Sequence, residues 1–216
     1  MLSSTLWELV KKVDIHLFSC IIHNIPILRG CIIMLKLEPF SQADFQQLID
    51  WIPNASFALQ WSGPAFTYPL TVEQLENYLN DANTVNASKY IFKAVDESTN
   101  EIIGHISIGN VDRVNESARI GKVLIGQSAS RGNGYGTQLM LAALTFAFEE
   151  LKLHKVTLGV FDFNTAAIKC YEKVGFKKEG LLRDARKNGD EYWNLIEMGI
   201  LESGWGDLRI KGVGIK

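Results

Sequence analysis

The sequence has little of what marks a metal protein, a disulfide-rich secreted protein or a nucleic-acid-binding protein. Its three cysteines, Cys20, Cys31 and Cys170, have neither metal-ligand spacing nor an even count. The formal net charge of −2 gives no bulk attraction to nucleic acid, and no basic tract stands out. We therefore expect a cytoplasmic protein in a reducing compartment, with no metal and no nucleic-acid partner.

The sequence also lacks a long apolar run free of charges and breakers. Its most apolar stretch, His16 to Leu35, is interrupted by polar residues and Pro26. A membrane span needs about 18 or more apolar residues with few charges, so we expect no membrane partner. A membrane-associated protein that uses residues 13–35 is the alternative.

The length of 216 residues suits one domain, either alone or with an appendage. Residues 1–33 do not resemble the rest in pattern, and we interpret them as an N-terminal extension that is not necessarily part of the native protein, with Met34 as the alternative start. The domain is expected over residues 34–203, followed by a loosely ordered tail at 204–216. Nothing in the sequence fixes the assembly beyond a monomer or a homodimer.

One stretch in the second half predicts an anion site. An apolar strand, 118–125, leads through a polar loop into Arg131-Gly-Asn-Gly-Tyr-Gly136 and then into an apolar helix over 135–151. The first N–H groups of a helix have no internal partner and carry a partial positive charge. No acid lies between Glu116 and Glu149, although an acid in the first turn would stabilise a helix that binds nothing. The alternative is a glycine-rich helix start without a ligand.

The spacing of these glycines excludes two phosphate-binding motifs. Position 137 is Thr, so Gly-x-Gly-x-x-Gly is not completed, and no Gly-x-x-x-x-Gly-Lys-Ser/Thr occurs. The stretch instead resembles the Arg/Gln-x-x-Gly-x-Gly/Ala motif of the GNAT acetyltransferase superfamily, as Arg131-x-x-Gly134-x-Gly136. A second block of that family follows as Asn164-Thr-Ala-Ala-Ile-Lys-Cys-Tyr171-Glu-Lys-Val-Gly175-Phe176. The whole pattern is similar to the branch of ribosomal-protein-alanine N-acetyltransferases.

The resemblance implies an α/β fold of the GNAT type over 34–203. Its mixed, largely antiparallel sheet would have a central splayed parallel strand pair and helices on both faces. The sequence places strands at 35–39, 90–95, 102–108 and 156–161, helices near 41–51, 71–81 and 165–174, a hairpin of 177–187 with 191–201 around Asn188-Gly189, and irregular structure at 54–70.

By the same resemblance, the cofactor is acetyl-CoA, as a co-substrate. Backbone N–H groups of the glycine-rich turn would hold its pyrophosphate, and the strand edge after Gly121 would pair with the pantetheine arm and polarise the thioester carbonyl. The loop at 126–130 is about one residue longer than in many relatives, which leaves the register of that arm open. The residues expected to bind the cofactor are Val123, Leu124, Ile125, Arg131, Gly132, Asn133, Gly134, Tyr135, Gly136, Thr137 and Asn164.

Asn164 and Tyr171 are seven positions apart and therefore lie on one helix face, about 10 Å apart along the axis. In the family, the matching Asn contacts the cofactor arm and the matching Tyr lies near the thioester sulfur. We predict Tyr171 as the catalytic residue, a hydrogen-bond donor to that sulfur. On the residues alone, Asn164 is equally a helix N-cap and Tyr171 equally a core aromatic. Cys170 is expected to be a small buried residue.

The acceptor amine and its base are less determined by sequence. Many relatives have an acid before Ile120, where this chain has Arg119. Glu116 and His105 qualify as bases only by neighbourhood, so we assign no base; a water relay, which needs no dedicated residue, is the other possibility. The acceptor side is expected to use Trp61, Phe66, Tyr68 and His105 with the terminal hairpin. The alternative is that the aromatic residues only cap the core.

The resemblance thus predicts an acetyl-CoA-dependent N-acetyltransferase in which a primary amine attacks the thioester directly. The missing base favours an acceptor that is partly neutral at pH 7, such as a protein N-terminus. The alternatives are an enzyme that acetylates a small amine, such as a polyamine or an antibiotic, and a CoA-binding module without catalysis.

Overall fold

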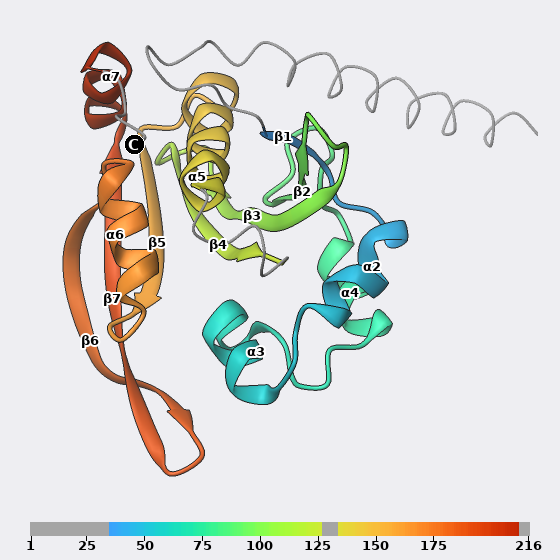
Figure 1. Ribbon diagram of the computed structural model, residues 1–216. Coiled ribbons are helices and arrows are strands. Elements are labelled where there is room, and N and C mark those ends of the chain that lie inside the picture. The colour runs from blue at the N-terminus through green and yellow to red at the C-terminus, as the bar shows by residue number, and fades with distance from the viewer. Residues whose placement is uncertain (1–34, 127–133, 212–216) are drawn as a thin grey trace, which may run out of the picture.

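The computed structural model describes residues 35–126 and 134–211, and the side chains of 35–126 and 134–208. Over these residues one sheet runs in the order β1-β2-β3-β4-β5-β7-β6 (Figure 1). Only β4 and β5 pair in parallel, which confirms the predicted mixed sheet. The strands are β1 (Leu35–Pro39), β2 (Tyr90–Asp96), β3 (Ile102–Asp112), β4 (Ser117–Ile125), β5 (Lys155–Phe161), β6 (Lys177–Asn188) and β7 (Glu191–Leu201).

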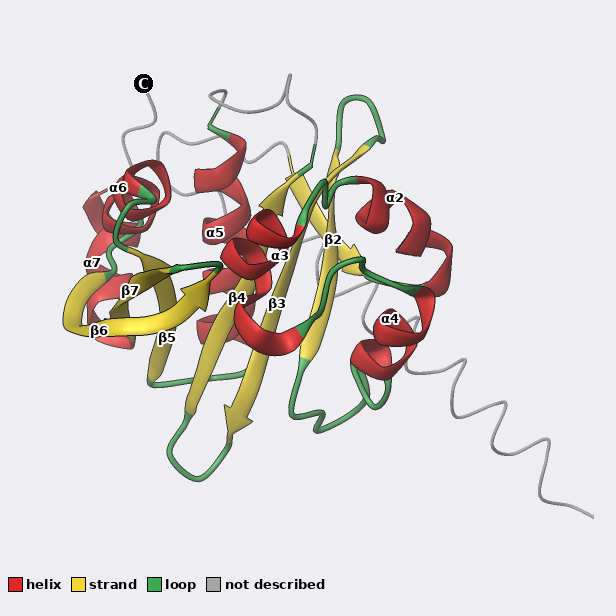
Figure 2. Ribbon diagram, turned by 90° about the horizontal axis from the view of Figure 1, so that it is seen from below, coloured by secondary structure: helices red, strands yellow, loops and turns green. Residues whose placement is uncertain are grey.

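Helices cover both faces of the sheet, as the burial of β2 on both of its faces shows. Phe92 belongs to a core with α5 and α6, whereas its neighbour Ile91 belongs to a second core with α2, α3 and α4. In Figure 1, α5 lies above the strands β3 and β4, and α2, α3 and α4 lie below them; Figure 2 shows the latter face. The helices are α2 (Phe45–Asp50), α3 (Ala55–Ser62), α4 (Val72–Leu79), α5 (Tyr135–Thr145), α6 (Thr165–Lys173) and α7 (Glu202–Lys211).

Helix α5 is the centre of the larger core. Every side chain from Thr137 to Thr145 is buried, as expected for a helix that is apolar on all sides. The helix continues with π-type hydrogen bonding over Phe146–Glu150, so the helical segment predicted at 135–151 is confirmed. Thr145 satisfies its buried hydroxyl by donating to the Leu141 carbonyl at 3.0 Å.

The end of helix α6 and the C-terminal hairpin turn lie at the glycines where the sequence predicted them. Helix α6 ends before Gly175, whose φ of +94° is a conformation that a side chain would oppose. The hairpin of β6 and β7 pairs Asn188 with Glu191, so its two loop residues are Gly189 and Asp190. Gly189 takes a φ of +61°, which explains the glycine of the Asn-Gly signal.

Two segments are more ordered than the sequence predicted. The irregular structure predicted at 54–70 is wrong for α3, because Asn54 caps that helix by accepting from the Phe57 N–H at 2.8 Å and because Ala58 and Trp61 are buried. The tail expected from residue 204 is helical to Lys211, and its Trp205 is buried against Phe148. None of the helices in the described part of the chain is long and apolar enough to cross a membrane.

Candidate active site

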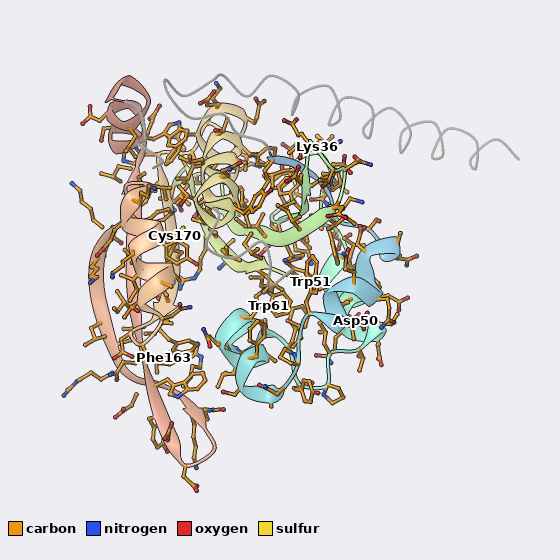
Figure 3. All side chains as sticks on the ribbon, in the orientation of Figure 1. Lys36, Asp50, Trp51, Trp61, Phe163 and Cys170 are labelled. Carbon is orange, nitrogen blue, oxygen red and sulfur yellow. The ribbon has the colours of Figure 1, made fainter. Side chains whose placement is uncertain are left out.

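The two parallel strands separate partway along their length. They pair only through Ser117–Arg119 on β4 and Lys155–Thr157 on β5, although β4 runs on to Ile125 and β5 to Phe161. A cavity of about 940 Å³ lies in this opening and is lined by both strands, by α3, by α6 and by the start of α5. This volume is at the upper end of what small-molecule and cofactor sites occupy. Trp61 and Cys170 lie on its two sides (Figure 3).

A bulge in β4 shapes the strand edge that faces the cavity. Gly121 pairs with Ser107 and Leu124 with His105, so two residues of β4 stand opposite one residue of β3. Upstream, Ile120 packs in the core with α5; past the bulge Val123 packs on that core and Leu124 on the opposite one. The extra residue therefore shifts the facing of β4 by one position. Lys122, with φ of +51°, absorbs the change.

The bulge also decides where the backbone N–H groups point. The Gly126 N–H donates to the Ile103 carbonyl at 2.9 Å, toward β3. Backbone N–H groups alternate in direction along a strand. The N–H of Leu124 therefore also points toward β3, and the N–H of Val123 points to the other side. That other side is the open edge that lines the cavity. Gly104 lets the strands approach, because a Cβ there would lie 2.6 Å from the Leu124 carbonyl oxygen.

The start of α5 borders the same cavity. Gly134 precedes the helix with a φ of +82°, and Gly134, Gly136 and Thr137 are lining residues. The first turn of α5 carries no acid, so its partial positive charge is not compensated there. Tyr135 directs its hydroxyl to Asp96 and is not part of the cavity wall. Arg131, Gly132 and Asn133 lie outside the described residues.

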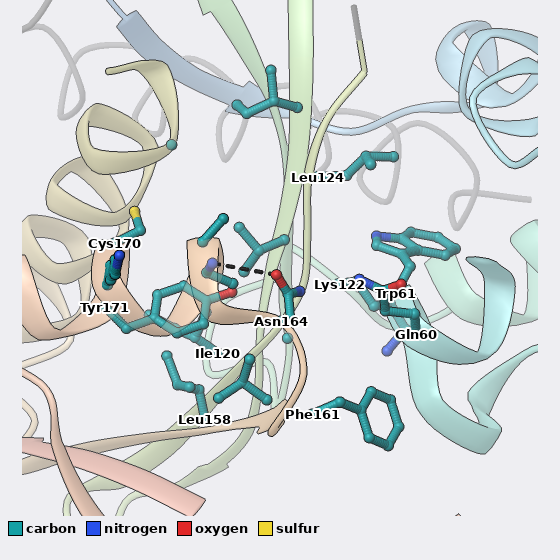
Figure 4. A pocket seen from close by; sticks show the side chains of 18 of the residues that line it. Gln60, Trp61, Ile120, Lys122, Leu124, Leu158, Phe161, Asn164, Cys170 and Tyr171 are labelled. Atoms are coloured by element: carbon teal, nitrogen blue, oxygen red, sulfur yellow. Dashed lines mark hydrogen bonds between the residues drawn. The ribbon is translucent and has the colours of Figure 1, made fainter. Parts of the chain in front are cut away.

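Helix α6 supplies the predicted polar pair. Asn164 and Tyr171 both line the cavity, with Asn164 acting as N-cap by accepting from the Ala167 N–H at 3.3 Å (Figure 4). Both interpretations of Asn164, cap and cavity residue, are therefore compatible. Burial raises the pKa of Tyr171 above its usual 10. Its hydroxyl has no hydrogen-bond partner within residues 35–126 and 134–211.

Cys170, next to Tyr171, packs between α6 and α5. Its Sγ lies 3.7 Å from the Thr137 Oγ1, and burial raises the pKa of the thiol. A raised pKa keeps the thiol protonated and a poor nucleophile. The geometry thus supports a packing role for this cysteine, although it is half-buried and reaches the cavity wall.

The opposite wall of the cavity comes from α3. Of the three aromatic residues predicted for the acceptor side, only one lies in this wall. Trp61 lines the cavity and stacks on Phe66 at 5.5 Å between ring centroids. Phe66 lies behind it, against Tyr78. Tyr68 is 46% exposed, and its hydroxyl donates to the Pro53 carbonyl, outside the cavity wall. Of these three, Trp61 alone is placed to meet a bound molecule.

His105 lies beneath this wall rather than on it. Its ring is buried among Phe40, Trp61 and Tyr78, and its Nδ1 donates to the Lys122 carbonyl at 3.0 Å. A neutral imidazole that donates through Nδ1 leaves Nε2 as an acceptor. That Nε2, the Trp61 Nε1 and the Tyr78 hydroxyl have no partner among the described residues. Burial lowers the pKa of His105 to about 4, which makes it a poor base for an amine.

Glu116, the other base considered, lies at the paired end of the strands. Its carbonyl accepts from the N–H groups of Lys155, the first residue of β5, and of His154 just before it. It does not line the cavity. Within residues 35–126 and 134–211, no cluster of His, Cys, Asp and Glu side chains is arranged to hold a metal ion.

Sequence reasoning missed Lys122 and the α3 residues Phe57 and Gln60. All three line the cavity. Lys122 follows from a bulge that depends on contacts between strands, and no local pattern marks it. Helix α3 did carry a signal, since Asn54 precedes it as a favourable N-cap and Pro53 and Pro64 bound it.

Known proteins share both the sequence pattern and the fold. The family described as "Acetyltransferase (GNAT) domain" matches residues 34–177. The aminoglycoside N(6')-acetyltransferase type 1 of Klebsiella pneumoniae is 25% identical over 152 residues, 68% of this chain and 75% of that protein. The SPbeta prophage-derived uncharacterized N-acetyltransferase YokL of Bacillus subtilis (strain 168) is 32% identical over 133 residues, 62% of this chain and 72% of that protein.

A solved structure has the same fold. The spermidine N-acetyltransferase from Vibrio cholerae in complex with CoA and spermine superposes with a TM-score of 0.69 at 24% identity, over 80% of this chain and 98% of that chain. The family match covers more than half of the chain and contains the strands, helices and both motifs on which the cavity is built. The chain therefore belongs to the GNAT acetyltransferase family and is an N-acetyltransferase.

Proposed function

We propose that the cavity binds acetyl-CoA along the open edge of β4 and transfers its acetyl group to a primary amine that enters from the α3 side. The observation that carries this proposal is the open edge of β4 from Gly121 to Leu124, where β4 forms no ladder with β5. It leads from Tyr171 and Asn164 to the uncompensated start of α5. An amide-rich arm can pair with such an edge as an added strand. A helix start with free N–H groups suits a diphosphate.

The residues of this edge also suit the chemistry. The Val123 N–H points to the open side, where it would donate to the thioester carbonyl as negative charge develops on its oxygen. The motif at 131–137 would hold the pyrophosphate, and of its described residues Gly134, Gly136 and Thr137 line the cavity. Asn164 would orient the cofactor arm through the amide nitrogen that its capping bond leaves unused.

Tyr171 would donate a hydrogen bond to the sulfur as the C–S bond breaks. An ordinary thiol has a pKa of about 8.5 and an ordinary tyrosine about 10, so full proton transfer to a free thiolate is uphill by about 2 kcal/mol. Burial raises the pKa of Tyr171 further, which favours the neutral donor over complete transfer. The proton lost by the amine would leave through water, since the cavity wall within the described residues includes no Asp, Glu or His.

The acceptor is the finer part of the proposal. The resemblance to the ribosomal-protein-alanine branch and the absence of a base favour a protein N-terminus, whose pKa of about 7.7–8.0 leaves part of it neutral. The relatives named for aminoglycosides and spermidine support the second candidate, a small amine. A monomer or a homodimer is compatible with either acceptor.

Two measurements test this proposal. Titration calorimetry with CoA should give one binding event per chain, and a thiol-detecting assay with acetyl-CoA should show acetyl transfer to at least one of a panel of peptides, polyamines and aminoglycosides. Slow thiol release from acetyl-CoA alone would also indicate an intact site. CoA binding without any transfer or thiol release would favour the non-catalytic module instead. The absence of CoA binding would contradict the proposal altogether.

A further inference from the structure

A second, smaller hollow adjoins the cavity on the acceptor side. It has a volume of about 260 Å³ and shares Gln60, Trp61 and Lys122 with the main cavity. Its own wall adds Arg119, Arg186 and the polar residues Ser107 and Asn110. Gln60 and Trp61 of α3 and Lys122 of β4 thus belong to the walls of both spaces, so the hollow is continuous with the α3 side of the cavity.

The walls of both spaces carry cations and no carboxylates. Lys122, Lys169 and Lys173 line the main cavity, and Arg119 and Arg186 line the smaller hollow. Within residues 35–126 and 134–211, no Asp or Glu is a lining residue of either space. Residues 127–133, which lie outside the described part, contain no acid in the sequence either.

These cations differ in whether they are already neutralised. Arg119 forms two hydrogen bonds to Glu197, at 2.7 and 2.9 Å, so its charge is compensated. Arg186 and Lys122 have no ion-pair partner in the described part of the chain. Lys122 is held by the faces of Tyr78 and Phe66, at 4.8 and 5.6 Å from the ring centroids. The acceptor side therefore presents two uncompensated positive charges.

Lys122 has features of a recognition group. Burial lowers its pKa, whereas the two aromatic faces favour the charged form. A partly buried ammonium without a counter-ion is costly, and a carboxylate brought by a ligand would relieve that cost. A polycationic ligand would instead add like charges, which disfavours its binding.

We infer that this site takes amines that carry a carboxylate close to the reacting amine, recognised by Lys122 and Arg186, and that it disfavours polycations such as spermidine. This inference rests on the proposed function, since it names the acceptor class of the same site. The shared chemistry is an acidic group beside a primary amine. The two sources of it are a peptide N-terminus with an adjacent acidic residue and a free amino acid.

The test measures acceptor binding directly, with the full chain saturated with CoA. The probes are three C-terminally amidated peptides, Ser-Asp-Ala-Ala, Ser-Asn-Ala-Ala and Ser-Lys-Ala-Ala, together with spermidine. Asp and Asn have the same shape, so their comparison isolates the charge. We expect the Asp peptide to bind about tenfold more tightly than the Asn peptide, and the Lys peptide and spermidine to bind more weakly than either. Free serine against serinamide distinguishes an amino-acid acceptor from a peptide.

Three variants assign the discrimination to its residues. Lys122→Met and Arg186→Gln should each remove most of the preference for the Asp peptide, and Lys122→Arg should retain it. Lys187→Met is the matched control, because Lys187 lies next to Arg186 on β6 but is exposed and lies outside both walls. The control should bind all probes as the parent does. Two independent substitutions keep the test decisive should one of them fail to fold.

The outcomes separate this inference from the proposed function. Equal affinity for the Asp and Asn peptides, or spermidine bound as tightly as the Asp peptide, would overturn the acceptor class. So would the absence of measurable binding by every acidic probe at millimolar concentration. Acetyl transfer to spermidine would then leave the proposed function intact. Binding of the Asp peptide without any acetyl transfer would support the acceptor class and contradict the catalytic proposal.

Discussion

The two ends of the β4–β5 strand pair are built for opposite purposes. At the closed end, Ser117–Arg119 pair with Lys155–Thr157, and Arg119 reaches across Gly159 to Glu197 on β7. At the open end, the same strands share no ladder and enclose a cavity. The closed end therefore positions the strands, and the open end leaves their backbone groups available.

Two residues mark the difference between the two ends, Gly159 at the closed end and Lys122 at the open end. A Cβ at Gly159 would lie 2.4 Å from the Arg119 Nη2, so this glycine admits the ion pair that joins three strands. Lys122, with its positive φ, turns the open half of β4 so that Leu124 packs toward α3. The open half of β4 is therefore packed on both of its faces, by Val123 on the α5 side and by Leu124 on the α3 side.

The largest expected effect is on the pH dependence of the unfolding free energy, and it comes from a histidine behind the open end. Behind the open end, burial lowers the pKa of His105 to about 4 from 6.5. Between pH 4 and 6.5 the unfolded chain therefore binds more protons at this histidine than the folded chain does. The contribution of neutral His105 to the unfolding free energy is full above pH 6.5 and is lost as the pH falls toward 4. His105→Gln should reduce the slope of unfolding free energy against pH by about one proton, roughly 1.4 kcal/mol per pH unit. Denaturant unfolding between pH 4 and 7 measures it.

An unchanged slope in His105→Gln would show that this imidazole does not carry the pH dependence of the open end.

The next effect concerns the contact that allows the bulge. Gly104→Ala places a Cβ 2.6 Å from the Leu124 carbonyl oxygen, which is backbone and cannot rotate away. We expect a loss of about 1–3 kcal/mol in unfolding free energy, as for overpacked sites, and weaker CoA binding because β4 shifts. Gly180→Ala, where a Cβ would meet nothing within 4 Å, should be tolerated. Equal stability of the two variants would refute the close-approach argument.

Tyr171→Phe tests the chemistry of the open end without changing its shape. Loss of the hydroxyl should lower turnover at least about tenfold, equivalent to about 1.4 kcal/mol of transition-state stabilisation, while CoA affinity stays nearly unchanged. Steady-state kinetics and CoA titration measure the two quantities. Equal turnover in the two proteins would refute the role of this hydroxyl.

The smallest effect belongs to the closed end. Arg119→Met leaves Glu197 without its partner, and both side chains are partly exposed. We therefore expect a loss of only about 1 kcal/mol in unfolding free energy. CoA affinity should change little, because Arg119 is not in the wall of the main cavity. A loss of CoA binding that exceeds the loss of stability would mean that the closed end does more than hold the strands.

Most of the fold was predictable because its signals are local. The Asn-Gly hairpin, the Gly175 helix stop, the apolar helix α5 and the strand periods are all encoded in neighbouring residues. The seven-residue spacing likewise placed Tyr171 and Asn164 on one helix face, and both line the cavity.

What was missed depends on contacts between distant segments. The Lys122 bulge is set by β3 and by the rings of Phe66 and Tyr78, and the order of α7 is set by Trp205 and Leu208 on the core. Tyr68 was expected on the acceptor side because the matching loop flanks the cofactor cleft in relatives, and His105 was expected there by neighbourhood. Their side chains turn to the surface and into the interior instead.

The most direct test of the account is amide hydrogen exchange with and without CoA. The account predicts that CoA slows exchange at Val123 and at the start of α5, Gly136 and Thr137, and leaves Val156 and Thr157 at the closed end unchanged. Unchanged exchange at Val123 while CoA is bound would contradict the claim that the open edge of β4 holds the cofactor.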